Sequence, residues 1–242
     1  MVILSAPSRL LLFDIDGTLV DTEGAGIRSL EKGFFEAFPE CESQPFPPLD
    51  LRGATDWGVA SYLFQHFGLA DHGENRKRFF DRYVNFLEAQ LVEYSLSGKG
   101  RALKGVSRLL AELDGAETYL MGLLTGNIEE GARAKLRHYS LDHRFGFGSF
   151  GGDRSLRNEL GPVAIERAGE FSGRSFRPEE TVIVGDTPKD IACARACGAA
   201  VIAVATGGIP LSELEDASPD ILIQDFSNLE ETLAAIESAF AL

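Results

Sequence analysis

Short apolar runs, almost unbroken by polar residues, recur along this 242-residue chain and limit the folds it can adopt. They lie at residues 9–13, 118–124, 181–184, 200–205 and 221–223. Continuous rather than alternating apolar character is typical of strands buried on both faces, as in a parallel sheet. Segments with a helical pattern follow the second, third and last runs, at 128–141, 188–198 and 228–240. This alternation predicts the α/β class, with a Rossmann-like parallel sheet as its core.

Residues 21–95 break this rhythm and predict an inserted helical domain. Apolar residues recur at helical spacing in three stretches, at 27–38, 57–67 and 80–94. No strand-like run occurs between them. We therefore expect a core formed by residues 1–20 and 96–242, with a helical cap formed by residues 21–95.

The net charge of −14 bears on the partners of the protein. Such a surface repels the phosphate backbone of nucleic acids and repels anionic membranes. The apolar run near the start of the chain stops at Asp14, which makes it too short to span a bilayer. We therefore expect a soluble, cytoplasmic protein that binds neither nucleic acid nor membrane. The oligomeric state is unknown from the sequence.

Polar residues at three predicted strand ends indicate a site, because ligands of such sheets bind beyond the carboxyl ends of the strands. The first strand is followed by Asp14 and Asp16, the second by TGN at 125–127 and the third by GDTPKD at 185–190. The fold would bring these segments to one edge. Gathered carboxylates need a cation, and oxygen ligands suit magnesium. Once the charge is neutralised, one carboxylate can attack an electrophilic phosphorus.

The segments DIDGTLVD at 14–21, LLTGN at 123–127 and GDTPKD at 185–190 resemble, in this order, motifs one, two and four of the haloacid dehalogenase superfamily. The helical insertion resembles its type-1 cap, and the phosphoglycolate phosphatase-like branch looks most similar. The resemblance extends over most of the chain. It implies a magnesium-dependent phosphatase that hydrolyses a small phosphorylated metabolite through an aspartyl-phosphate intermediate.

The resemblance also implies roles for four acids. Asp14 would be the nucleophile, and Asp16 would be the general acid for the leaving oxygen and then the base for the attacking water. Two acids are needed because one attacks while the other moves protons. Asp14, the backbone carbonyl of Asp16, and Asp186 would bind magnesium. Asp190 would be a further acid near the metal, although with Thr187 it also fits an N-terminal capping box.

The second motif supplies the residues that would hold the phosphate. Thr125, with the backbone N–H groups of Gly126 and Asn127, would bind its oxygens at a helix start, where an anion is favoured. An alternative for Asn127 is a helix cap formed with Glu130.

The third motif departs from the family, which normally has a lysine before motif four. No lysine occurs between Leu136 and Pro188. Arg157 stands at the expected distance, and its planar guanidinium can bridge the nucleophile carboxylate and a phosphate oxygen. We expect Arg157 to replace the lysine. The alternatives are Arg154 in that role, or two solvated loop arginines.

Several functions remain open at this level. By analogy, residues 51–57 would form the substrate-facing loop of the cap, where Arg52 either meets a substrate anion or is a solvated charge. A phosphomutase of the same fold would use the same acids but need a bisphosphate activator. A catalytically inactive binding module is disfavoured because all four acids are present. A haloacid dehalogenase is disfavoured because those enzymes lack the second acid, here Asp16.

Overall fold

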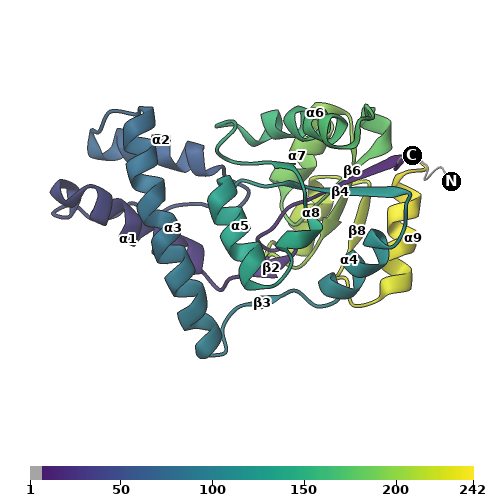
Figure 1. Cartoon of the computed structure of the whole chain (residues 1–242), viewed down its shortest axis with the longest axis horizontal. Helices are drawn as coiled ribbons and strands as arrows, with labels where there is room; N and C mark the ends of the chain where they lie inside the picture. Colours follow the sequence, from purple (N-terminus) through teal and green to yellow (C-terminus); the bar gives the residue numbers. More distant parts are fainter. Residues whose placement is uncertain (1–6) are drawn as a thin grey trace.

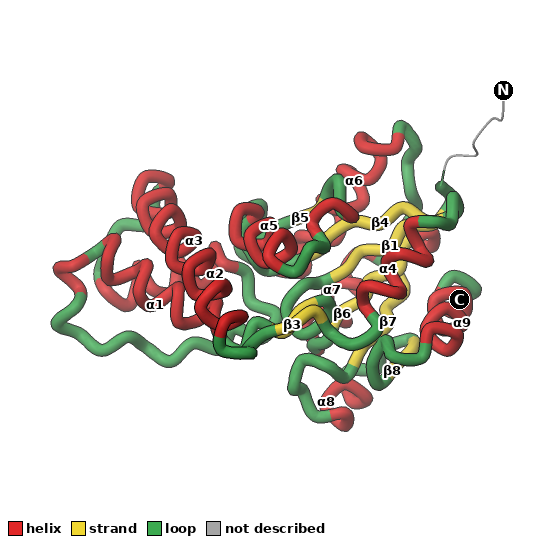
Figure 2. The backbone as a smooth tube through the Cα atoms, turned by 60° about the horizontal axis from the view of Figure 1, so that its bottom comes forward, coloured by secondary structure: helices red, strands yellow, loops and turns green. Residues whose placement is uncertain are grey.

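Strand β1 (Arg9–Phe13) lies inside a parallel sheet, in the right half of Figure 1 and in yellow in Figure 2. The computed structural model describes residues 7–242. The strand order is β5 (Gly148–Ser149), β4 (Tyr119–Leu124), β1, β6 (Thr181–Gly185), β7 (Ala200–Val204) and β8 (Ile221–Ile223). Every adjacent pair in this sheet is parallel. The predicted α/β class with a Rossmann-like core is therefore confirmed, and each of the five apolar runs contains a strand.

Helices cover both faces of the sheet because successive side chains of a strand point to opposite sides. Leu11 and Phe13 face one side and Leu10 and Leu12 the other, and all four are buried. The first side is covered by α4 (Val106–Asp114), α5 (Glu129–His138) and α9 (Leu229–Ala239). The second side is covered by α6 (Leu160–Ser172), α7 (Pro188–Cys197) and α8 (Leu211–Asp216). Within residues 7–242, no helix combines the length and the apolar character needed to cross a membrane.

Some core elements were not predicted, namely β5, α4 and α8. β5 has two residues and α8 has six, which is too short to carry a periodic apolar pattern. α4 does carry one, since Val106, Leu109, Leu110 and Leu113 are buried at helical spacing. Short 3₁₀ helices lie at Pro39–Cys41, Asp142–Arg144, Arg157–Glu159 and Pro178–Glu180.

Three helices form the insertion between β1 and β4, as predicted, and they are α1 (Ala25–Ala37), α2 (Asp56–Phe67) and α3 (Gly73–Leu96). Their own core is rich in phenylalanine. The ring of Phe34 lies 4.8–6.4 Å, between centroids, from those of Phe38, Phe64, Phe67 and Phe79. At the base of the insertion, β2 (Val20–Asp21) pairs antiparallel with β3 (Arg101–Ala102).

The insertion docks on the core through α5, which lies beside α3 (Figure 1). Ile128, just before α5, and Ala134 are buried in the phenylalanine-rich core of the insertion. Ala132 and Leu136 of the same helix are buried in the core of the sheet. α5 therefore belongs to two hydrophobic cores at once, so side chains along it are held between the sheet and the insertion.

The close approach of α1 and α3 gives a test of the packing in the insertion. A Cβ at Gly33 would lie 2.7 Å from both the backbone nitrogen and the Cα of Tyr83. Gly33→Ala should therefore lower the free energy of unfolding by about 1–3 kcal/mol, because the helices must separate. The measurement is urea unfolding followed by the fluorescence of Trp57.

Gly73→Ala is the matched control, because a Cβ at this first residue of α3 meets no atom within 4 Å. It should change stability by less than about 0.5 kcal/mol. Equal effects of the two substitutions would contradict the packing argument.

Candidate active site

The chain turns sharply at the carboxyl end of β1 and presents two acids there. The amide of Asp14 donates to the carbonyl of Val184 in β6 at 2.9 Å. Gly17 then adopts a φ of +80°, a conformation that favours glycine, and its amide donates to the carbonyl of Val20 at 2.8 Å. The side chain of Asp14 is 7% exposed and that of Asp16 is 40% exposed. The two acids therefore sit in different environments, one enclosed and one open.

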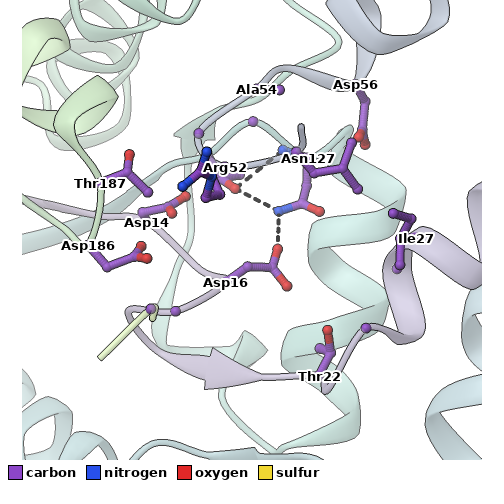
Figure 3. Close-up of a pocket in the computed structure, with 18 of the residues that line it drawn as sticks. Asp14, Asp16, Thr22, Ile27, Arg52, Ala54, Asp56, Asn127, Asp186 and Thr187 are labelled. Atoms are coloured by element: carbon purple, nitrogen blue, oxygen red, sulfur yellow. Dashed lines mark hydrogen bonds between the residues drawn. The ribbon is translucent and has the colours of Figure 1, made fainter. Parts of the chain in front are cut away.

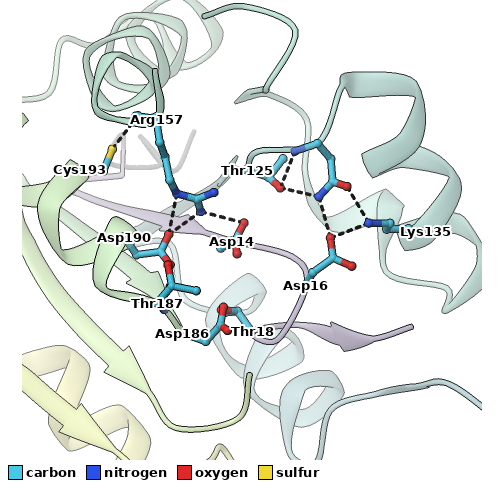
Figure 4. Close-up of polar contacts among 11 residues, drawn as sticks. Asp14, Asp16, Thr18, Thr125, Lys135, Arg157, Asp186, Thr187, Asp190 and Cys193 are labelled. Carbon is cyan, nitrogen blue, oxygen red and sulfur yellow. Dashed lines mark hydrogen bonds and ion pairs between the residues drawn. The ribbon is translucent and has the colours of Figure 1, made fainter. Parts of the chain in front are cut away.

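Three carboxylates meet beside this turn, those of Asp14, Asp186 and Asp190 (Figure 4). One oxygen of each lies within 4.8 Å of the others. Burial raises the pKa of Asp14 to about 6, against the opposing effect of Arg157. Burial also raises the pKa of Asp186 well above its usual range. Their ionised forms are thus costly without a further positive charge.

The donor set fits a divalent cation. Arg157 is one positive charge in contact with a group of three carboxylates, which leaves negative charge uncompensated. Glycine keeps space open beside Asp186, because a Cβ at Gly17 or Gly207 would collide with its Oδ2. The hydroxyl of Thr18 donates to Oδ1 of the same carboxylate at 3.1 Å. Carboxylate oxygens are preferred ligands of hard divalent ions, so these acids could bind a metal.

Arg157 begins a short 3₁₀ helix and reaches into this cluster. Its Nη2 lies 3.0 Å from Oδ1 of Asp14, and its Nε donates to Oδ1 of Asp190 at 3.1 Å. Desolvation would lower the pKa of this guanidinium, but the two carboxylates outweigh it and hold the pKa above its usual value. Arg154 is exposed instead, and its guanidinium donates to the carbonyl of Asp153. Of the two arginines, Arg157 is the one that contacts Asp14.

Both side-chain oxygens of Asp190 are engaged. Oδ1 accepts from Arg157, while Oδ2 accepts from the amide of Thr187 at 3.1 Å and from its hydroxyl at 2.8 Å. The capping box at the start of α7 is therefore present. The side chain of Asp190 therefore caps α7 and also lies in the acid cluster.

Asn127 turns its side chain into the site (Figure 3). Its Nδ2 donates to Oδ2 of Asp16 at 2.8 Å and to Oγ1 of Thr125 at 2.8 Å, and its amide donates to the same hydroxyl at 3.3 Å. The N-cap of α5 is Ile128, without a side-chain cap. The capping alternative for Asn127 is therefore wrong, because Oδ1, the atom that would cap the helix, accepts from Nζ of Lys135 at 2.6 Å.

Lys135 of α5 belongs to the same group, although it lies outside the sequence motifs. Its Nζ lies 2.6 Å from Oδ2 of Asp16 and 2.6 Å from Oδ1 of Asn127. A signal was present, because Ile128, Gly131 and Lys135 recur at i, i+3 and i+7, the spacing of a buried helix face. A lysine on such a face is unusual unless it is paired. The side chain of Asp16 is therefore bound to these two partners and lies outside the acid cluster.

The loop at 51–57 of the insertion rests on the loops that follow β4 and β5. The amide of Asp56 donates to the carbonyl of Gly126 at 2.7 Å, and that of Trp57 donates to the carbonyl of Gly151 at 3.0 Å. A Cβ at Gly126 would collide with the backbone of this loop. The insertion and the edge of the sheet together line a cavity of about 710 Å³ (Figure 3).

The wall that the insertion contributes is partly apolar and partly charged. Arg52 borders the cavity, but its guanidinium pairs with Asp50 at 2.9 Å and is largely exposed. The apolar part of the wall includes Ile27, Leu30, Leu49, Leu51 and Val59. Acidic residues at this wall are Asp21, Glu23, Asp50 and Asp56.

Asp56 is buried where the insertion meets the core. Its Oδ2 accepts from the amide of Ile128 at 2.8 Å. Burial raises the pKa of Asp56 to about 6, although the Ile128 amide and the charge of Lys135 oppose the rise. Ionisation of Asp56 therefore destabilises this contact between the insertion and the core.

A parallel sheet that gathers acids at its carboxyl edge, beneath a helical insertion, is the architecture of a capped α/β enzyme. The family model described as haloacid dehalogenase-like hydrolase matches residues 11–204. The protein belongs to this family, as the motifs predicted.

Individual relatives agree with this assignment. A phosphoglycolate phosphatase of Agrobacterium fabrum is 27% identical over 228 residues, which cover 93% of this chain and 92% of that protein. A hydrolase from Pseudomonas syringae shares the fold with a TM-score of 0.68 at 22% identity, covering 94% of this chain and 99% of that one. A β-phosphoglucomutase from Clostridium difficile has a TM-score of 0.69 at 14% identity, covering 97% of both chains. These two structural likenesses establish the shared fold alone.

The buried carboxylate of Asp56 predicts a pH-dependent stability. Its pKa is about 6 in the folded protein, against an ordinary value of 3.8. The folded state therefore binds more protons between these values, so stability falls as the pH rises through them, by up to about 3 kcal/mol. Asp56→Asn keeps an acceptor for the Ile128 amide but cannot ionise. The melting temperature of Asp56→Asn minus that of wild type should therefore be larger at pH 8 than at pH 5.

Fluorescence of the adjacent Trp57, the one tryptophan of the sequence, measures this transition. Asp50→Asn is the control, because hydrogen bonding from Arg52 lowers the pKa of Asp50. Any pH trend in that variant should have the opposite sign. A pH-independent difference between Asp56→Asn and wild type would contradict the prediction.

Proposed function

We propose that this protein is a magnesium-dependent phosphatase that hydrolyses a small phosphorylated metabolite through an aspartyl-phosphate on Asp14. One observation carries the proposal, namely the two acids at the end of β1 in contrasting settings. Asp14 is enclosed and lies 3.0 Å from Nη2 of Arg157, whereas Asp16 is half-exposed and accepts from Asn127 at 2.8 Å. Such a pair supplies a held nucleophile and a separate group for proton transfer.

The two acids divide the reaction between them. A carboxylate oxygen of Asp14 attacks phosphorus, the bond from phosphorus to the leaving oxygen breaks, and Asp16 gives that oxygen a proton. Asp16, now ionised, takes a proton from water as the water attacks the aspartyl-phosphate. Inorganic phosphate leaves, and both acids return to their starting forms.

Donors other than the two acids hold the phosphate group. The hydroxyl of Thr125 and the amide of Gly126 donate to its oxygens, and the backbone amide of Asn127 would do so by giving up its bond of 3.3 Å to that hydroxyl. The hydroxyl of Thr125 accepts from Asn127, so its own hydrogen remains free to donate. Nη1 of Arg157 takes no part in that residue's contacts with acids, and it is the donor left for a phosphate oxygen.

Asp14 and Asp186, with the backbone carbonyl of Asp16, would hold the magnesium ion. When bound, the ion supplies positive charge that stabilises the attacking and leaving oxygens. Asp190 lies within the same cluster, but its oxygens accept from Arg157 and Thr187. Its part is to hold the guanidinium beside Asp14.

The cavity of about 710 Å³ suits a small-molecule leaving group. The insertion lies over the edge of the sheet and keeps bulk water from the intermediate. Arg52 borders the leaving-group side and would meet a substrate anion once released from Asp50. The net charge of −14 opposes a nucleic-acid substrate.

A panel of phosphorylated metabolites, with an aryl phosphate included, tests the function. Phosphate release should require magnesium, stop on chelation and return when magnesium is added. Calcium should support little turnover, because it takes more ligands in a looser geometry. Asp14→Asn, assayed in parallel, should release no phosphate.

Each departure from this result has a meaning. Full activity after chelation would refute the role of the metal, and activity in Asp14→Asn would refute the nucleophile. Turnover that needs a bisphosphate activator would indicate a phosphomutase. No release from any ester would overturn the enzymatic proposal in favour of a binding module.

Arg157 should be the cation of the third motif. Arg157→Ala should raise KM and lower kcat together, with kcat/KM falling about 10²-fold or more, the scale of losing one preorganised donor. Arg157→Lys should recover part of the loss, since a charge remains but the bidentate fork is gone.

Arg154→Ala is the control, because the exposed Arg154 does not line the cavity. Its kinetics should be close to wild type. A crippled Arg154→Ala beside a normal Arg157→Ala would move the role to Arg154.

A further inference from the structure

Lys135 brings a second positive charge to the site, apart from Arg157. Its side chain is 4% exposed and projects from α5 toward Asp16 (Figure 4), and it also donates to Oδ1 of Asn127. The insertion closes over it, since a Cβ at Gly26 of α1 would lie 3.6 Å from its Nζ. A buried ammonium is costly unless strong partners compensate it. The two contacts of 2.6 Å are those partners.

The ammonium fixes the orientation of the Asn127 amide. Lysine only donates, so the carbonyl oxygen Oδ1 of Asn127 must face it. Nδ2 then points the other way and donates to Asp16 and to the hydroxyl of Thr125, each at 2.8 Å. A single charge on α5 thereby sets the arrangement of the second motif.

Both donors to Asp16 use the same oxygen. Nζ of Lys135 and Nδ2 of Asn127 each contact Oδ2, at 2.6 Å and 2.8 Å. Oδ1 receives neither contact. It is the oxygen left to exchange a proton with a leaving group or with water.

We propose that Lys135 is a positioning residue that fixes Asp16 for proton transfer and, through Asn127, fixes Thr125 for phosphate binding. The inference rests on the proposed phosphatase function and deepens it, because it assigns the two cations to different acids. Arg157 serves the nucleophile, and Lys135 serves the acid–base residue.

The leaving group of the substrate tests this assignment. An alkyl phosphate needs a proton on its leaving oxygen, whereas p-nitrophenyl phosphate releases a stable anion without one. In Lys135→Met, kcat/KM should therefore fall at least about tenfold more for the alkyl ester than for the aryl ester, since general acid catalysis contributes about 10²–10⁴-fold. Lys135→Arg, which keeps the charge, should recover part of this difference.

Arg137→Met is the matched control. It removes a positive charge from the same helix, but Arg137 is 55% exposed and pairs with Glu88 at 3.4 Å. The ratio of the two esters should not change in this variant. Equal losses on both esters in Lys135→Met would overturn the proposal, because they would indicate a general effect on the fold or on phosphate binding.

Crystal structures of the wild type and Lys135→Met give a second readout that does not depend on turnover. We expect the carboxylate of Asp16 and the amide of Asn127 to rotate away from each other in the variant. Unchanged positions would overturn the positioning role whatever the kinetics. Rotation in a protein whose wild type hydrolyses neither ester would refute the phosphatase function and retain the positioning role. If the methionine variant does not fold, Lys135→Gln takes its place in both measurements.

Discussion

Excess negative charge at the carboxyl edge of the sheet is the constraint on which the rest of the site depends. Asp14 and its two acidic neighbours lie close together in a buried place, where ionised carboxylates are costly. The two cations are kept apart, with Arg157 on Asp14 and Lys135 on Asp16. What remains is a deficit of positive charge next to the hydroxyl of Thr125 and the amide of Gly126. Such an acid cluster could bind a divalent cation.

The helix α5 connects this electrostatic arrangement to the fold. One face of it is buried with the sheet and another with the phenylalanine-rich core of the insertion. Lys135 lies between them, and the amide of Ile128 at its start receives the carboxylate of Asp56 from the insertion. The placement of the insertion and the orientation of Asp16 are therefore properties of the same helix.

Sequence patterns predicted what depends on local burial and on strand ends. The continuous apolar runs identified five strands, and the acids that follow two of them meet as the topology requires. The role of Lys135 was not predicted, because its partner Asp16 is 119 positions away. Periodicity indicates that a helix face is buried but not which residues pack against it. Asn127 and Glu130 match a helix cap in local sequence. The side chain turns elsewhere because its oxygen, the atom that would cap the helix, accepts from Lys135, while its Nδ2 donates to Asp16.

The hydrogen bonds that dock the loop at 51–57 on the core join main-chain atoms, from the amides of Asp56 and Trp57 to the carbonyls of Gly126 and Gly151. Contacts of this kind are indifferent to the side chains that flank them. Side chains of this loop can therefore change without loss of the hydrogen bonds that hold the insertion on the sheet. The sequence is constrained instead at the two glycines, where any side chain would collide with neighbouring backbone. Docking of the loop therefore constrains the sequence at these two glycines more tightly than within the loop itself.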